Sequence, residues 1–214
     1  MIEDVLDSEE LVFLRAAIDD IYSGYDPERD GLGHMEGYRF ATNLVDKGEF
    51  FRDIFLRGPV YDLMKHFLGD DCILSSLNSL EPLQGHGDQD LHRDVSSPPS
   101  GGIESMNSLW IIDDIDTGNG ATRVVPASHR TDDDAEKLET KPIHVQVHAG
   151  SVVVINAHLL HGASANMSGR RRRIMHGFYT KRGNPQQLEH RRFVSPEAQA
   201  LLSPEARKVL VLDG

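Results

Sequence analysis

Residues 150–164 read Gly-Ser-Val-Val-Val-Ile-Asn-Ala-His-Leu-Leu-His-Gly-Ala-Ser. The β-branched residues at 152–155 favour a strand, because branched side chains fit the pleated surface of a sheet. Ala149 and Gly150, just before this run, can form the turn from a neighbouring strand. The stretch therefore predicts a strand over 151–156, with two histidines beyond its end.

Further short β-like runs surround this stretch and are separated by Gly, Pro, Asn and Asp. They cover 72–80, 105–113, 122–126, 142–148 and 172–180. Asn119-Gly120 adds a strong tight-turn signal. Since no helical pattern alternates with these runs, they predict a mainly β, antiparallel fold of the jelly-roll type with flanking helices.

The first third of the chain carries the helical signals. Residues 8–22 predict an amphipathic helix, because Asp7 and Glu10 have capping-box spacing ahead of an apolar periodicity. A second helix is expected at 59–68, and 24–48 reads as loop with little pattern. We expect one domain, with a helical part over 1–69, a β-rich core over 70–180 and a C-terminal tail over 181–214.

Composition narrows the function classes. The net charge of −12 argues against a broad nucleic-acid surface, and Cys72 is the only cysteine, which excludes an internal disulfide. Without an export signal or a long apolar run, we expect a cytoplasmic protein with no membrane partner. Of the basic run 170–173, Arg170, Arg171 and Arg173 are expected at a solvated strand end, whereas Arg172 needs separate treatment.

Two His-x-Asp pairs could each grip a metal ion from one face of a strand, where residues two apart point the same way. Pairs of this kind also arise by chance, so their context decides. The first pair, His86 and Asp88, lies between glycines that favour a loose loop. The second pair, His92 and Asp94, lies in a segment better suited to a short strand, and we expect it to bind the metal.

A third ligand must come from another strand. His158 is expected to be an ordinary edge histidine, whereas His161 is followed by Gly162, which allows close backbone approach. Two imidazoles and one carboxylate leave open coordination positions, the arrangement expected of non-haem Fe(II) oxygenases. A carboxylate at Asp94 also favours hydroxylation over halogenation.

Three motifs in this order and spacing resemble the phytanoyl-CoA dioxygenase family. They are His92-Arg-Asp94, then Asp114-Ile-Asp-Thr-Gly-Asn119-Gly120-Ala-Thr-Arg-Val-Val-Pro126-Ala-Ser-His129, then His161-Gly-Ala-Ser-Ala-Asn166-Met-Ser-Gly-Arg-Arg-Arg172. The resemblance implies a double-stranded β-helix of the cupin-like kind in which His92, Asp94 and His161 hold Fe(II). It also implies 2-oxoglutarate and O2 as cosubstrates, and a hydroxylated small-molecule product released with succinate and CO2.

The same resemblance assigns contacts to the cosubstrate. Arg172, eleven residues past His161, would pair with the distal carboxylate of 2-oxoglutarate, for which a guanidinium offers two parallel hydrogen bonds. Trp110 matches a family tryptophan beside the cosubstrate, and Leu77 and Ser79 fall on an early strand that often contacts it. For Trp110 and Leu77 a plain core position is the alternative.

The chain departs from the family at two places. It lacks the strand that usually precedes the first helix, so either that strand is missing or another segment closes the sheet edge. The family's Pro-Gly-Ser-His reads Pro126-Ala127-Ser128-His129, and we expect His129 to be structural.

The substrate cannot be identified from the sequence. Candidate wall residues are a lid over 95–104, Glu36, Arg39 and His176. No basic pocket for a CoA phosphate is recognisable, so a small polar metabolite or natural-product intermediate is the expected substrate. Two alternatives remain open: a non-redox cupin-like isomerase or hydrolase with Zn(II) or Mn(II), and a non-catalytic jelly-roll binding module.

Overall fold

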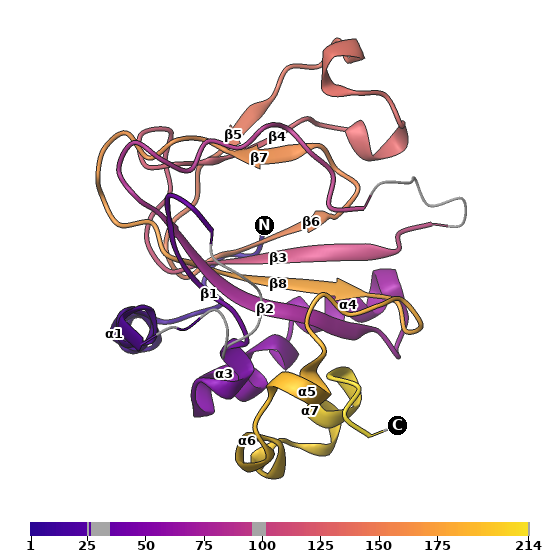
Figure 1. Ribbon diagram of the computed structural model, residues 1–214. Coiled ribbons are helices and arrows are strands. Elements are labelled where there is room, and N and C mark those ends of the chain that lie inside the picture. Colours follow the sequence, from indigo (N-terminus) through magenta and orange to yellow (C-terminus); the bar gives the residue numbers. More distant parts are fainter. Residues whose placement is uncertain (25, 27–34, 96–101, 214) are drawn as a thin grey trace.

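Two antiparallel sheets face each other in the computed structural model, which describes residues 1–24, 26, 35–95 and 102–213 (Figure 1). The large sheet has the order β1 (Tyr38–Ala41), β2 (Ile73–Pro82), β8 (Ile174–Thr180), β3 (Ser105–Ile111) and β6 (Val152–Asn156). The small sheet has the order β5 (Ile143–Val145), β4 (Thr122–Val124) and β7 (His161–Ala163). The predicted mainly β jelly roll is confirmed.

Helices cover the face of the large sheet that is turned away from the small sheet (Figure 1). They are α1 (Ser8–Gly24), α3 (Glu49–Asp53), α4 (Val60–Leu68), α5 (His190–Phe193), α6 (Pro196–Leu201) and α7 (Pro204–Val209). Single 3-10 turns lie at Leu44–Asp46, Ile54–Leu56, Ser128–Arg130 and Ala135–Lys137. In the described part of the chain, none of the helices has the length and apolar character needed to cross a membrane.

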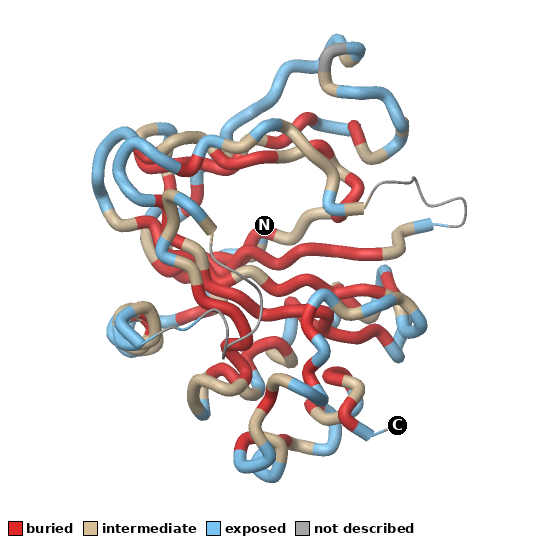
Figure 2. The backbone as a smooth tube through the Cα atoms, in the orientation of Figure 1, coloured by how far each residue is buried: buried red, intermediate tan, exposed pale blue. Residues whose placement is uncertain are grey.

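The main core lies between these helices and the large sheet. It includes Leu14 and Ile18 of α1 together with Leu77, Trp110 and Tyr179 of the sheet, all fully or almost fully buried. The inner strands β2, β8 and β3 of the large sheet are buried along most of their length, whereas the outermost part of the small sheet, β5, is largely exposed (Figure 2). The helices therefore pack on one face of the large sheet.

The capping signals read from the sequence are present. The Asp7 carboxylate accepts a hydrogen bond from the Glu10 backbone N–H at 2.8 Å, and the Glu10 carboxylate accepts one from the Asp7 N–H at 3.0 Å. This reciprocal pair satisfies donors that the first turn of α1 leaves free. Helix α4 begins directly after Pro59 and is followed by Gly69, whose φ of 101° suits glycine.

The basic run before β8 differs from the expectation of a solvated strand end. Arg173 is 7% exposed, and its guanidinium donates to Asp113 at 2.8 Å and to Asp19 of α1 at 3.0 Å. Arg171 pairs with Asp19 and with the buried Glu81. The expected solvated position is wrong for Arg173, whereas the Arg171 side chain remains 39% exposed. The ion pairs of both arginines tie α1 to the sheet.

The segment 24–48, expected to be loop, contains a strand at one edge of the large sheet. Strand β1 lies within 24–48 and pairs with β2, from Tyr38 opposite Pro82 to Ala41 opposite Ser79. At the other edge, Ile2 forms a bridge with Val152 of β6. β1 therefore covers the free edge of β2, and Ile2 covers part of the edge of β6. The expected C-terminal tail likewise contains α5, α6 and α7.

The replacement of the family's glycine at Ala127 has a local cost. Ala127 adopts φ 65° and ψ 0°, in the left-handed region that a side chain with Cβ occupies unfavourably. The strain is about 1 kcal/mol relative to glycine. This turn must be held by its surroundings, and the buried Ser128 hydroxyl, which accepts from the Leu160 N–H at 2.8 Å, provides one such contact.

The pH dependence of stability should reflect His190. Burial in the helical layer lowers the pKa of His190 to about 4. As the pH falls below about 6.5 the unfolded chain takes up a proton that the folded protein cannot bind until about pH 4, so stability is lost across this window. We expect His190→Phe to flatten the slope of unfolding free energy against pH by up to about 1.4 kcal/mol per pH unit.

Urea unfolding of the metal-free protein at several pH values between 4 and 7 measures this slope. His144→Phe makes the same change at an exposed histidine and should leave the slope unaltered. An equal slope in His190→Phe and the wild type would contradict the assignment.

Candidate metal centre

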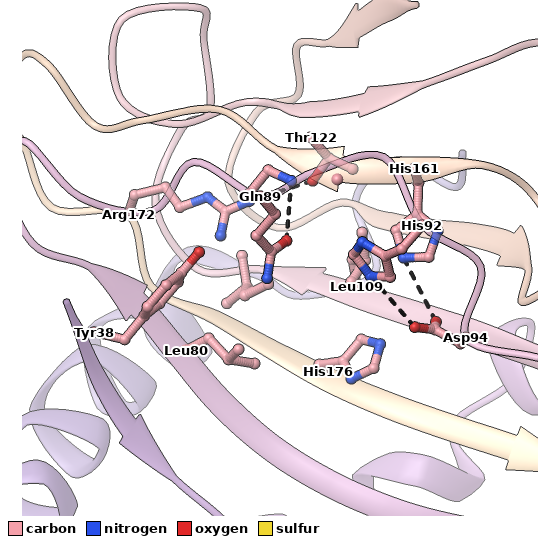
Figure 3. Close-up of a pocket in the computed structure, with 13 residues that line it drawn as sticks. Tyr38, Leu80, Gln89, His92, Asp94, Leu109, Thr122, His161, Arg172 and His176 are labelled. Atoms are coloured by element: carbon pink, nitrogen blue, oxygen red, sulfur yellow. Dashed lines mark hydrogen bonds and ion pairs between the residues drawn. The ribbon is translucent and has the colours of Figure 1, made fainter. Parts of the chain in front are cut away.

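Three side chains with metal-binding atoms converge between the two sheets: His92, Asp94 and His161 (Figure 3). One potential ligand atom from each lies within 4.8 Å of the others. His92 Nε2 is 3.6 Å from Asp94 Oδ1, and His161 Nε2 is 3.5 Å from Asp94 Oδ2. Separations of this size fit three ligands around one cation, and the structure brings together the three residues selected from the sequence.

The backbone holds the two histidines side by side. The His92 N–H donates to the His161 carbonyl at 2.8 Å, and the His161 N–H donates to the His92 carbonyl at 3.0 Å. His161 begins β7, whereas the segment around His92 and Asp94 is irregular apart from this bridge. The expected short strand is therefore reduced to a single bridge, and Asp94 is fixed by its own N–H, which donates to the Ala157 carbonyl at 3.0 Å.

Both imidazoles are oriented by a backbone carbonyl. His92 Nδ1 lies 2.8 Å from the Asp90 carbonyl, and His161 Nδ1 lies 2.8 Å from the Leu159 carbonyl. A carbonyl oxygen only accepts, so each Nδ1 must carry the proton when the ring is neutral. Each Nε2 is then left with a lone pair directed at the other ligands, the form in which histidine binds a metal.

The Asp94 carboxylate stays ionised at neutral pH. Burial alone would raise its pKa, but His92 and His161 when protonated, together with the hydrogen bond from Asn107, hold the pKa at about 2. The same Asp94 carboxylate raises the pKa of His92, against the effect of burial. The three residues thus offer two nitrogens and one anionic oxygen, a donor set suited to Fe(II).

A cavity extends from these three residues to Arg172 (Figure 3). Its lining is Tyr38, Leu80, Gln89, His92, Asp94, Leu109, Thr122, His161, Gly162, Ala163, Arg172, Ile174 and His176. Burial lowers the pKa of His176 to about 4, so this wall residue is neutral at physiological pH. The apolar side chains of Leu80, Leu109 and Ile174 also line the cavity.

Arg172 supplies an unneutralised cation at the far end of the cavity. It is 3% exposed, and one guanidinium nitrogen donates to Thr122 Oγ1 at 3.3 Å. Its Nε has no hydrogen-bond partner, and no carboxylate among the described residues pairs with it. Burial lowers the pKa of Arg172 to about 10, which keeps it charged at pH 7. A buried guanidinium without an anion is unfavourable, so this end of the cavity is suited to binding a carboxylate.

The three weaker cosubstrate residues do not reach the cavity. Leu77 and Trp110 are fully buried in the core on the helical face of the large sheet, and Ser79 donates to the Ile174 carbonyl and contacts Tyr22. The placement of Trp110 and Leu77 at the cosubstrate is therefore corrected to the alternative, a core position. Side chains alternate along a strand, so the cavity instead receives Leu109 and Leu80.

Other candidates lie outside the centre. His86 and Asp88 are exposed, and Asp88 pairs with Arg123 at 3.1 Å. His158 is buried rather than at an edge, with Nδ1 3.0 Å from the Val95 carbonyl.

Of the remaining expected wall residues, Glu36 and Arg39 do not line the cavity, and Arg39 pairs with Glu81. Most of the expected lid, 96–101, lies outside the described residues.

Several cavity residues were not anticipated, among them Tyr38, Gln89 and Thr122. Asn107 was also missed, although it donates to Asp94. The only signal for Asn107 was an amide on the same strand face as the apolar Leu109 and Ile111. Tyr38 and Gln89 had no comparable signal, because they lie in short or irregular segments.

Comparison with known proteins identifies a family for this chain. The model of the phytanoyl-CoA dioxygenase family matches residues 1–174. "Dioxygenase af480" of Aspergillus fumigatus is 25% identical over 176 residues, covering 79% of this chain and 57% of its own length. "Iron/alpha-ketoglutarate-dependent dioxygenase ausU" of Aspergillus calidoustus is 28% identical, covering 66% and 52%. The chain therefore spans about half the length of these relatives.

Solved structures share the fold at lower identity. HygX from Streptomyces hygroscopicus, with nickel and 2-oxoglutarate bound, has a TM-score of 0.71 at 16% identity and covers 86% of this chain and 83% of its own. The non-haem alpha-ketoglutarate-dependent epimerase SnoN, from nogalamycin biosynthesis, has a TM-score of 0.69 at 18% identity, with coverage of 84% and 77%. Both similarities support the jelly-roll architecture.

Removal of the carboxylate tests the proposed centre. We expect Asp94→Ala to raise the dissociation constant for Co(II), a spectroscopic substitute for Fe(II), on the order of 100-fold or more, because the only anionic ligand is lost. Calorimetric titration of the metal-free protein measures it. Asp88→Ala removes the aspartate of the other His-x-Asp pair and should bind Co(II) as the wild type does. Unchanged Co(II) binding by Asp94→Ala would exclude this centre.

Proposed function

Because this chain belongs to the phytanoyl-CoA dioxygenase family, we propose that it is an Fe(II)- and 2-oxoglutarate-dependent dioxygenase that acts on a small molecule. The observation that carries the proposal is the buried, unneutralised Arg172 at the opposite end of a cavity from His92, Asp94 and His161. One end of the cavity provides metal ligands and the other provides a site for a carboxylate. A molecule that chelates a metal and carries a distant carboxylate matches both ends.

His92, Asp94 and His161 would hold the iron from one side. Their Nε2 atoms and carboxylate are already oriented by the Asp90 and Leu159 carbonyls and by Asn107. Oriented ligands lose little conformational freedom on binding, which favours affinity. Three protein ligands leave positions free for a cosubstrate and O2.

Arg172 and Thr122 would bind the distal carboxylate of 2-oxoglutarate. The guanidinium can donate two parallel hydrogen bonds, and the Thr122 hydroxyl lies beside it. Leu80, Leu109 and Ile174 would enclose the carbon chain and exclude water. When bound, iron(II) would activate O2, which would oxidise both 2-oxoglutarate, to succinate and CO2, and the substrate.

Hydroxylation is the reaction that we propose. The carboxylate ligand Asp94 occupies the place where a smaller residue would leave room for a halide. The neutral imidazole of His176 lines the cavity beside the metal ligands and would form part of the substrate wall. A small polar metabolite or natural-product intermediate is the proposed substrate class.

Anaerobic reconstitution tests the function. Fe(II)-loaded protein should develop a visible absorption band when 2-oxoglutarate is added, and admission of O2 with substrate candidates should produce succinate. Zn(II)-loaded protein is the control and should show neither. An Fe(II) protein without a 2-oxoglutarate-dependent band would refute the proposal and favour a non-redox metal enzyme.

The role of Arg172 has its own prediction. We expect Arg172→Met to weaken 2-oxoglutarate binding by on the order of 30-fold or more, since a charge-assisted contact is worth about 2–5 kcal/mol. Without ligand, the variant should be as stable as the wild type or more stable, because a buried charge without a partner is removed.

Calorimetry with Ni(II)-loaded protein measures the affinity, and thermal unfolding measures the stability. Arg170→Met, at an exposed arginine paired with Asp116, should retain wild-type affinity. If Arg172→Met bound 2-oxoglutarate as tightly as the wild type, Arg172 would not be the residue that binds the distal carboxylate.

A further inference from the structure

Asn107 is a buried amide in direct contact with the carboxylate of the candidate metal centre. It lies in β3, opposite Phe178 of β8 and Ile155 of β6, and it is 0% exposed. Its Nδ2 donates to Asp94 Oδ2 at 2.6 Å. A short hydrogen bond to an ionised acceptor is among the stronger polar contacts in a protein interior.

The orientation of this amide is fixed by chemistry. An ionised carboxylate only accepts hydrogen bonds, so Asn107 must present its NH2 group to Asp94 and turn its carbonyl away. That carbonyl is buried, and among the described residues it has no hydrogen-bond partner. An unsatisfied buried acceptor is destabilising. Folding stability alone therefore favours an apolar residue here, like Leu109 and Ile111 on the same strand face.

The hydrogen bond from Asn107 orients Asp94, a residue that is not itself part of a strand. Asp94 lies in an irregular segment where its backbone N–H is fixed to Ala157, but this leaves the carboxylate free to rotate. Oδ2 accepts a hydrogen bond from Asn107 and also lies 3.5 Å from His161 Nε2, whereas Oδ1 lies 3.6 Å from His92 Nε2 and, among the described residues, accepts no hydrogen bond. The two oxygens of Asp94 are thereby made unequal.

We propose that Asn107 is a positioning residue for Asp94, which holds Oδ2 and reserves Oδ1 as the single oxygen that binds the metal. This inference rests on the proposed function. Binding through one oxygen would keep more coordination positions of the metal open. A carboxylate that bound through both oxygens would take one position needed by the chelating cosubstrate or O2.

Asn107→Leu tests the proposal, with Asn78→Leu as the matched control. Both asparagines are buried on the same face of the large sheet. Among the described residues both have a carbonyl without a partner, but Asn78 donates only to Ser76, at 3.5 Å. Calorimetric titration of each metal-free protein with Co(II) gives the dissociation constants, and the visible spectrum reports the Co(II) coordination.

We expect Asn107→Leu to raise the Co(II) dissociation constant by about 10- to 100-fold and to alter the Co(II) spectrum, whereas Asn78→Leu changes neither appreciably. Equal affinity and an unchanged spectrum in Asn107→Leu would overturn the inference. If the wild type itself binds no Co(II), the proposed function fails instead, so the two failures are distinguishable.

A measurement on the wild type covers the case in which Asn107→Leu does not fold. In Zn(II)-loaded protein with labelled asparagine, one assigned side-chain amide proton of Asn107 should resonate downfield and exchange slowly with water. A side-chain amide that shows neither property after metal loading would overturn the inference without any variant.

Discussion

Alternation of side chains along β8 and the residues before it is the constraint on which this structure depends. Arg171 and Arg173 point to the helical side and pair with Asp19 of α1. Arg172, Ile174 and His176 point to the opposite side and line the cavity. A shift of one residue would place the cation in the helical layer and two arginines in the cavity. The same segment therefore attaches α1 to the sheet and contributes three of the residues that line the cavity.

The metal centre combines regular and irregular backbone. His161 belongs to β7, but His92 and Asp94 lie in a segment with little secondary structure. This segment can hold ligands because its backbone donors are satisfied by His161 and Ala157. Each ligand side chain then has a second partner, a carbonyl for each histidine and an amide for Asp94. Ligand side chains held by such protein contacts lose little conformational freedom when a cation binds, which is the physical meaning of preorganisation.

The sequence was sufficient for those features that depend on local pattern or on unusual chemistry. All six strands expected from β-branched runs are present, as is the capping box of α1, and the three metal-binding candidates converge. What failed depended on register or on short elements. Trp110 was expected beside the cosubstrate but lies in the core. A match to a family motif identifies the residue type at a position, but it does not say to which face of the sheet the side chain points. Strand β7 and helix α5 span three and four residues, too few for a periodic signal.

The position of the single tryptophan has a practical consequence for work on this protein. Trp110 lies under the helical layer, on the far side of the large sheet from the cavity, and its indole N–H donates to Ser108. Its emission wavelength will thus respond to water entering between helices and sheet. Occupation of the cavity changes the environment of Leu109 rather than that of the indole. Intrinsic fluorescence should accordingly report the separation of the helices from the large sheet, and it should change little when a ligand enters the cavity.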